Sequence, residues 1–274
     1  MLTVSETELG TSESTWMGSS RLASLPVMQW RSPRRVVVVA PHPDDEVLGV
    51  GGSLRSLARA GAAVEVVAVT DGEASHPGSD AITPAELARV RAAESEAALS
   101  RLGLGRPRRL RLHLPDGHVS TFEEELTDQL GDLLDGDTLC LATWRGDGHP
   151  DHEAVGRAAG RASLRRKARF VEFPVWAWHW ASPAASDPAG LPWPRAHRHV
   201  LDDAGWQAKA SAIAAFASQT TRVGPDPADR AVLPGPVLQR FRRRFEVLFE
   251  GPDTPSDPPL PDVPRASEVA PTDD

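Results

Sequence analysis

The chain has 274 residues, a formal net charge of −8, a hydrophobic fraction of 40% and a charged fraction of 25%. These values are ordinary for a protein with a sizeable core, and the length suits one large α/β domain or two small ones. The negative charge argues against nucleic acid as a partner, because phosphate binding needs a basic face. No apolar run approaches the roughly 18 residues of a membrane span, so no membrane partner is expected.

The two ends of the chain differ in composition from its middle. Residues 1–30 are rich in Ser, Thr and Glu, and we predict a flexible tail there, from which Trp16 and Trp30 could dock on the body. Residues 251–274 are mostly Pro, Asp and Ser, which predicts a second, disordered tail. One domain is therefore expected over residues 31–250.

Cysteine usage and the N-terminus predict the cellular compartment. The single cysteine, Cys140, lies in an apolar stretch and forms no internal disulfide, which fits a reducing cytoplasm. Burial as a small hydrophobic residue is a more common role for such a cysteine than catalysis. The N-terminus carries no apolar segment of the kind found in secretory signals, so we predict a cytoplasmic protein.

Hydrophobic periodicity predicts strands alternating with helices along the chain. The predicted strands cover residues 36–40, 63–70, 109–114, 138–143, 169–173 and 198–202. The predicted helices cover residues 46–60, 84–102, 121–135, 151–166, 203–217 and 237–249. Such alternation with short loops is typical of βαβ units and a parallel sheet.

The second predicted helix carries the clearest start signal. Thr83 suits the N-cap, Pro84 the first turn and Glu86 the third helical position, which together make a capping box. On the same helix we interpret Arg89 and Arg91 as a solvated face.

The first motif follows the first predicted strand. Residues 36–39 are four consecutive valines, a pattern typical of a strand buried on both faces. The strand ends in His42, Asp44, Asp45 and Glu46. Open α/β sheets bind ligands at the carboxyl ends of their strands, so this arrangement indicates a functional site.

The second motif occupies the corresponding place after the fourth predicted strand. His149, Asp151 and His152 lie there in a loop that leads into a helix. Right-handed crossovers put the carboxyl ends of parallel strands on one edge of the sheet. We therefore expect four polar clusters to converge at this edge of the sheet. These clusters are residues 42–46, 71–73, 113–118 and 144–152.

His42, Asp45 and His152 make a set of two histidines and one carboxylate. Imidazole and carboxylate ligands together suit a borderline divalent metal such as zinc, and three protein ligands leave a position open for water. A metal in such a site lowers the pKa of bound water towards about 7. The pattern thus predicts a catalytic metal site with one ion per chain.

The neighbouring polar residues have candidate roles in such a site. Asp44 is free to take a proton from the attacking water. His149 can donate to an oxyanion or to a leaving amine, and Asp151 can hold an imidazole in the required tautomer. Glu46 could position substrate or stabilise the N-terminus of the following helix.

The two motifs resemble those of the LmbE-like (PIG-L) family of zinc-dependent N-deacetylases. The resemblance lies in residues 40–46 and 149–152, with a weaker likeness at residues 70–73, and it extends over about residues 34–250. It implies a single α/β domain with a Rossmann-like, mostly parallel sheet flanked by helices. It also implies zinc on His42, Asp45 and His152. Asp44 would then be the general base, and His149 would stabilise the oxyanion. The implied substrate is a small molecule in which an amino sugar carries an N-acetyl group, commonly N-acetylglucosamine linked to another group.

The sequence departs from the family pattern at one position. Members place a tyrosine two residues before the first histidine of the second motif, where it helps hold the oxyanion. This chain has no tyrosine, and Asp147 at that position is a candidate substrate contact. Oxyanion stabilisation would then fall to the metal, His149 or another donor such as Arg145. Trp176 and Trp178, which alternate at strand spacing, could stack on a sugar ring or pack in the core.

Three alternatives remain open from the residues alone. Two histidines and one carboxylate also bind iron in mononuclear non-haem enzymes, so Fe2+ is a second candidate metal. The glycines at 49, 51 and 52 suggest a nucleotide-binding loop, but Leu54 occupies the third position of that fingerprint. A metal-stabilised binding module without catalysis would leave Asp44 and His149 without a role.

Overall fold

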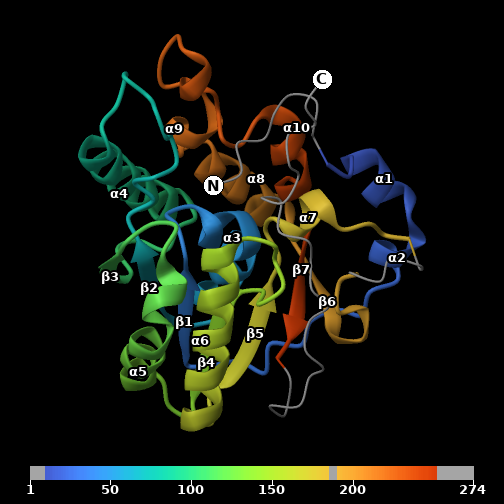
Figure 1. Cartoon of the computed structure of the whole chain (residues 1–274). Coiled ribbons are helices and arrows are strands. Elements are labelled where there is room, and N and C mark those ends of the chain that lie inside the picture. Colours follow the sequence, from blue (N-terminus) through green and yellow to red (C-terminus); the bar gives the residue numbers. More distant parts are fainter. Residues whose placement is uncertain (1–9, 185–189, 252–274) are drawn as a thin grey trace, which may run out of the picture.

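The computed structural model describes residues 10–184 and 190–251, and Figure 1 shows the chain as one α/β domain. Its sheet has seven strands in the order β3-β2-β1-β4-β5-β7-β6. Strands β1 to β5 pair in parallel, whereas β7 runs antiparallel to both β5 and β6. The prediction of a single, mostly parallel α/β domain is confirmed. Within the described ranges, no helix has both the length and the apolar character to cross a bilayer.

The strands are β1 (Arg35–Ala40), β2 (Ala63–Thr70), β3 (Arg108–Leu114), β4 (Thr138–Thr143), β5 (Arg169–Phe173), β6 (Ala196–Val200) and β7 (Phe245–Glu250). The α-helices are α1 (Glu13–Gly18), α2 (Ser20–Ala23), α3 (Asp45–Arg59), α4 (Pro84–Arg101), α5 (Glu123–Leu133), α6 (Pro150–Arg166), α7 (Ala177–Trp180), α8 (Asp203–Ile213), α9 (Ala217–Thr220) and α10 (Gly235–Leu238). Single 3-10 turns lie at Val119–Phe122, Trp193–Arg195, Pro227–Asp229 and Gln239–Phe241.

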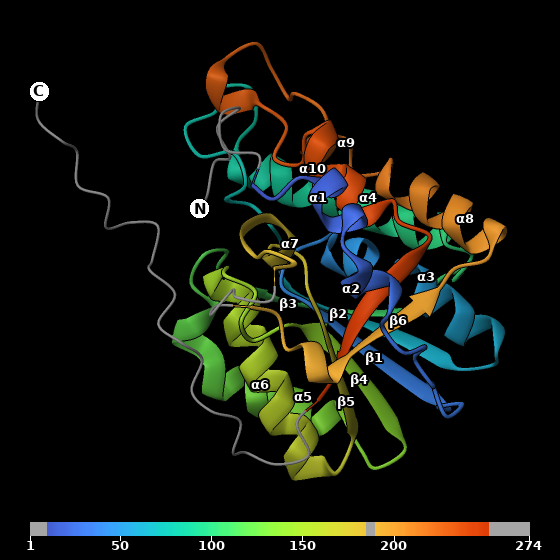
Figure 2. The same cartoon turned by 90° about the vertical axis from the view of Figure 1, so that its right-hand side faces the viewer.

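The valines of β1 explain why this strand forms the centre of the sheet. Val36 and Val38 face the layer of helices α3, α4 and α8, and Val37 and Val39 face α5 and α6. Figure 2 shows these two helical layers on opposite faces of the sheet. Successive side chains of a strand point to opposite faces, so a strand covered on both sides must be apolar throughout. Cys140 of β4 is also fully buried, as predicted.

Helix α3, which begins at Asp45 within the first motif, is broken near its start. Val50 has non-helical angles (φ −136°, ψ 16°), which frees the following amide groups from the helical ladder. The amides of Gly52 and Ser53 donate instead to the carboxylate of Glu246 on β7, at 2.8 Å each. Lys209 of α8 donates to the same carboxylate at 2.6 Å. A buried charge therefore joins α3, α8 and β7.

The C-terminal part of the chain corrects one prediction. Residues 237–249 were expected to form a single helix, but they contain the end of α10, a 3-10 turn and most of strand β7. The alternation of Phe245, Val247 and Phe249 suits a strand, because aromatic and β-branched residues pack well on a pleated surface.

The N-terminal segment corrects the prediction of a flexible tail over residues 1–30. Residues 10–30 are not a loose tail, since they contain α1 and α2 and bury Trp16 completely. Trp30 also docks on the body, where its indole N–H donates to Nδ1 of His199 at 3.1 Å. Residues 1–9 and 252–274, to which the predicted tails extend, lie outside the described residues.

Removing the predicted capping box should lower stability modestly. The Thr83 hydroxyl accepts the amide N–H of Glu86, and the Glu86 carboxylate accepts the amide N–H of Thr83, so the box is formed. We expect Thr83→Ala to reduce the free energy of unfolding by about 1 kcal/mol in a urea titration. Exposed Glu96, in the middle of the same helix, provides the control: Glu96→Ala should change it by less than about 0.5 kcal/mol. Equal effects of the two variants would contradict the capping role.

Candidate active site

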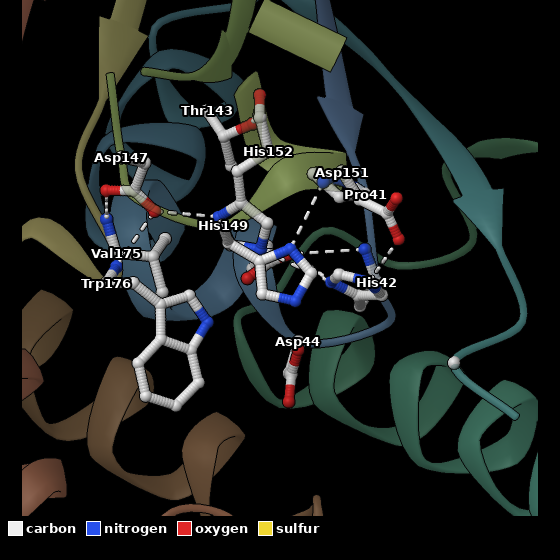
Figure 3. A network of polar contacts seen from close by, with 12 residues as sticks. Pro41, His42, Asp44, Thr143, Asp147, His149, Asp151, His152, Val175 and Trp176 are labelled. Atoms are coloured by element: carbon white, nitrogen blue, oxygen red, sulfur yellow. Dashed lines mark hydrogen bonds and ion pairs between the residues drawn. The ribbon is translucent and has the colours of Figure 1, made fainter. Parts of the chain in front are cut away.

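The two motifs meet at the point where the strand order of the sheet reverses. The chain passes from β1 to β2 and β3 on one side, and β4 and β5 lie on the other. The loop after β1 carries His42 and the loop after β4 carries His149, so the two loops flank the crevice that such a reversal leaves (Figure 3). The convergence expected from the sequence is present.

Three donor atoms form a nearly equilateral triangle in this crevice. Nδ1 of His42, Nε2 of His152 and Oδ2 of Asp45 lie 3.3 Å from one another. Ligands about 2.0–2.1 Å from a tetrahedral metal ion are separated by about 3.3–3.4 Å, so the triangle matches three corners of such a site. All three residues are buried, and the donor set therefore fits a divalent cation such as zinc or iron.

The far nitrogen of each histidine in the triangle faces a carboxylate. Nε2 of His42 lies 3.1 Å from Asp116 and 3.2 Å from Asp151, and Nδ1 of His152 lies 2.8 Å from Asp147. Burial alone would lower the pKa of His152, but the nearby carboxylates outweigh burial and raise it to about 9. Such partners orient an imidazole and select the tautomer that presents its other nitrogen to a metal.

Asp151 lies where a residue that holds an imidazole should lie. Its side chain has no exposed surface, and besides facing His42 it accepts the amide N–H groups of Gly117 (2.7 Å) and Val119 (3.0 Å). The loop after β3, which also carries Asp116, is thereby attached to the second motif.

Asp147 is directed away from the crevice, contrary to the expectation that it could contact substrate. It is fully buried, and besides His152 it accepts the backbone N–H groups of Val175, Trp176 and Ala177 at 2.8–3.0 Å. Figure 3 shows its carboxylate between His152 and this backbone. With four donors around its two oxygens, it has no capacity left for a ligand.

Asp44 lies beside the triangle without belonging to it. Its backbone has φ +152°, a region that non-glycine residues rarely adopt and that is often found at functional sites. The Arg91 guanidinium lies 3.1 Å from its carboxylate, and Glu46 accepts its amide N–H at 3.2 Å. Burial raises the pKa of Asp44 to about 7, although Arg91 opposes this increase.

His149 lies at the mouth of the crevice with one nitrogen already occupied. Its Nδ1 accepts the amide N–H of Asp151 at 3.2 Å, so a neutral ring carries its proton on Nε2. Burial and the neighbouring His152 and His42 lower the pKa of His149, which keeps the ring neutral. A neutral ring with a proton on Nε2 can act as a hydrogen-bond donor.

Arg91 was interpreted as part of a solvated helix face, and that interpretation is wrong. Only 2% of the residue is exposed, and it donates to the carbonyl oxygens of Gly72 and Pro43 at 3.0 Å each. Leu87 and Ser95, one turn before and after it, are buried too. A charged residue at four-residue spacing within a buried stripe was the signal that could have identified it.

The crevice opens into a pocket with one polar and one apolar side. Its polar lining includes residues of both motifs, and its other wall is largely apolar, formed by Leu48, Val175, Trp176, Val232 and Leu233. Asp116, Ser75 and Gln219 also line it. Asp116 belongs to the polar cluster at residues 113–118 that was expected at this edge, whereas Ser75 was not predicted.

The four other residues that were expected to contact substrate lie in different places relative to the pocket. Trp176 lines the pocket, but Trp178 is buried on α7, so the two tryptophans do not share a strand face. Arg145 donates to Glu172 at 2.8 Å and does not line the pocket. Glu46 is also absent from the lining, because its carboxylate faces the Asp44 amide and the Ser95 hydroxyl.

The glycine-rich start of α3 does not form a phosphate-binding loop. The amides of Gly52 and Ser53, which would have to face a phosphate, already donate to Glu246. A second carboxylate-rich cluster, at residues 44–46, would repel the anion as well. These contacts argue against the nucleotide-binding alternative.

Comparison with protein families gives one match in this part of the chain. Residues 37–163 match the family model described as PIG-L, GlcNAc-PI de-N-acetylase. The matched range holds both motifs, from the second residue after the start of β1 to the last turns of α6.

Several curated relatives and solved structures are similar to the chain, and two of the relatives illustrate the likeness. It is 31% identical over 141 residues to a probable N-acetyl-alpha-D-glucosaminyl L-malate deacetylase 2 of Bacillus cereus, a match covering 48% of this chain and 62% of that protein. It is 41% identical over 83 residues to a 1D-myo-inositol 2-acetamido-2-deoxy-alpha-D-glucopyranoside deacetylase of Rhodococcus opacus, covering 28% of each. Both matches span less than two thirds of the relative.

The solved structure is an N,N'-diacetylchitobiose deacetylase from Pyrococcus horikoshii in complex with an inhibitor. It superposes with a TM-score of 0.52 at 19% identity, over 82% of this chain and 78% of that chain. At this identity the likeness concerns the fold, and it agrees with the sheet described above.

Proposed function

We propose that the chain belongs to the PIG-L (LmbE-like) family, whose model matches residues 37–163, and that it hydrolyses the N-acetyl amide of an amino sugar or amino-sugar conjugate. The observation that carries the proposal is the triangle of His42, Asp45 and His152 with Asp44 and His149 beside it in one pocket. A purely structural metal site needs neither a general base such as Asp44 nor a hydrogen-bond donor such as His149 at its open side.

We assign the triangle to one metal ion per chain, with zinc as the expected metal and Fe2+ as the alternative. The ion would supply a Lewis acid that polarises the amide carbonyl and makes a water molecule nucleophilic near pH 7. Asp116, Asp151 and Asp147 face the outer nitrogens of the two histidines, so a bound ion would take the inner nitrogens while the outer N–H groups remain hydrogen-bonded.

The reaction then depends on two residues of this chain. Asp44 accepts a proton from the attacking water as its oxygen bonds to the carbonyl carbon of the acetamide. His149 donates a hydrogen bond from Nε2 to the developing oxyanion, in place of the tyrosine that this chain lacks. When the C–N bond breaks, the amine leaves with the proton that Asp44 accepted, and acetate remains.

Arg91 has a positioning role in this scheme. Two of its hydrogen bonds fix it to the carbonyls of Gly72 and Pro43, and its guanidinium then holds the Asp44 carboxylate at 3.1 Å. This contact holds the carboxylate of Asp44 in place next to the triangle, which lowers the entropic cost of reaching the reactive geometry.

The substrate proposal rests on the pocket and on the relatives together. The relatives named above act, by their names, on N-acetylglucosaminyl conjugates of malate and of inositol. The apolar wall of the pocket includes Trp176, and an aromatic ring of this kind suits the apolar face of a sugar. We therefore propose a small N-acetylated amino sugar or conjugate as the substrate.

Release of a primary amine tests the proposed function. Purified protein is treated with a chelator, reloaded with zinc or anaerobically with Fe2+, and assayed with fluorescamine on N-acetylglucosamine, chitobiose and the malate and inositol conjugates. We expect amine release from at least one conjugate by the reloaded protein and none by the chelated protein. If the reloaded protein binds metal but releases no amine from any of these compounds, the proposed substrate class is wrong.

A further inference from the structure

The segment that precedes the family match packs against the turn that forms one wall of the pocket. The segment is residues 10–18, which contain α1, and the turn is residues 174–181, which contain α7. Figures 1 and 2 both show α1 next to α7. Neither the segment nor the turn lies within residues 37–163, so the match gives no information about this contact.

Three hydrogen bonds join the segment to the turn. The Thr11 amide donates to the carbonyl of His179 at 2.8 Å, and the Thr11 hydroxyl donates to the carbonyl of Ala181 at 2.6 Å. The Trp16 indole N–H donates to the carbonyl of Trp178 at 3.0 Å. All three acceptors belong to the turn's backbone, so the segment supplies donors that the turn itself does not provide.

The contact between Trp16 and Trp178 is covered by the ion pair of Arg243 and Glu13. Trp16 is 0% exposed, and its ring meets that of Trp178 at 4.9 Å and 90°, the edge-to-face arrangement that aromatic pairs favour. Arg243 lies over the Trp178 ring at 4.2 Å and pairs with Glu13 of α1 at 2.7 Å. An exposed, mobile tail would not need such a buried, paired set of groups.

The other side of the same turn is held by the candidate active site. Asp147 accepts the backbone N–H groups of Val175, Trp176 and Ala177, and its main-chain carbonyl accepts the Trp180 indole N–H at 2.8 Å. Val175 and Trp176 are also the residues that the turn contributes to the pocket lining. The turn is therefore fixed between α1 and Asp147, with its pocket-facing residues in the middle.

We propose that α1 is a positioning element of the enzyme, which holds the turn so that Val175 and Trp176 form the substrate-binding wall. Trp16 is its central positioning residue, acting through Trp178. The effect on substrate binding rests on the proposed function, whereas the effect on the turn's order does not. Loosening the turn should weaken substrate binding more than it slows the chemical step, because the triangle and Asp44 come from other loops.

Point variants in the full chain test this proposal, with Trp16→Ala compared with Met17→Ala. Met17 is the next residue of α1 and is 53% exposed, so its variant controls for changes in the helix. We expect Trp16→Ala to raise KM by roughly tenfold with kcat changed by less than about threefold. We also expect faster hydrogen–deuterium exchange of the amides of residues 175–177 in this variant, and neither change in Met17→Ala.

Two milder variants keep the test informative if Trp16→Ala does not fold. Thr11→Val removes the hydroxyl bond to Ala181 with little change of shape, and Trp16→Phe keeps the ring contact but removes the bond to Trp178. Each should give a smaller change in exchange and in KM of the same kind. Unchanged exchange at residues 175–177 in folded variants overturns the proposal, even if the protein hydrolyses none of the amides assayed.

Discussion

Replacing Asp44 with asparagine should lower kcat by at least about 100-fold while leaving the metal bound. General-base catalysis contributes about 10²–10⁴-fold, and an amide cannot accept the proton of the attacking water. Asp44 is outside the triangle of His42, Asp45 and His152, so its side-chain charge is not needed to hold the ion. The measurement is kcat on the best conjugate, with the metal content of the same sample determined by mass spectrometry.

The geometry at Asp44 makes asparagine the right replacement. Its backbone has the unusual φ of +152°, and asparagine matches aspartate closely in size and shape, so it disturbs this conformation least. Asp71→Asn is a matched control, because Asp71 also follows a strand but pairs with Arg111 and His113 outside the pocket lining. Turnover near normal in Asp44→Asn with a full complement of metal would reject Asp44 as the base.

The sheet was predictable because its strands are covered on both faces. A strand such as β1 must then be apolar throughout, and four consecutive valines have few other interpretations. The C-terminal part was not predictable in the same way. Residues 237–249 combine a short helix, a 3-10 turn and an antiparallel strand, and segments of three to six residues are too short to establish a period.

The N-terminal segment shows the limit of composition as evidence. Residues 10–30 are polar on average, yet a tryptophan can bury about 150–250 Å² of surface and hold a helix against the body. Whether Trp16 does so depends on a matching site, and that site is made by Trp178 and Arg243, more than 160 residues away in the chain. No local pattern in the sequence reports such a contact.

Some of the site residues could be predicted from their local sequence, and others could not. The members of the donor triangle were predictable because they lie where a buried strand passes through a loop into a helix, at the carboxyl edge of the sheet. Arg91 was not, because its burial depends on which face of α4 packs inward. Asp147 was placed at the site correctly, but the direction of its carboxylate is set by the backbone of residues 175–177, which the sequence does not show.

The direction of the Asp147 carboxylate leads to the second large effect, a loss of metal affinity in Asp147→Asn. Asp147 can accept a hydrogen bond from Nδ1–H of His152, and in that tautomer of the neutral ring Nε2 is the nitrogen that faces the triangle without a proton. An amide NH2 group facing Nδ1 would favour the other tautomer and place a proton on the nitrogen that should bind the metal. We expect the zinc dissociation constant to rise by about 10–100-fold, measured by competition with a chromogenic chelator.

Asp147→Ala separates the tautomer effect from the loss of loop contacts. Alanine removes all four hydrogen bonds, so exchange at residues 175–177 should increase strongly, but His152 keeps its freedom to adopt the metal-binding tautomer. Asp147→Asn should instead retain part of the loop contacts, because the amide oxygen still accepts N–H groups, and yet bind zinc no better than Asp147→Ala. Wild-type zinc affinity in Asp147→Asn would show that this carboxylate does not set the protonation of His152. Its function would then be confined to the turn that α1 holds from the other side.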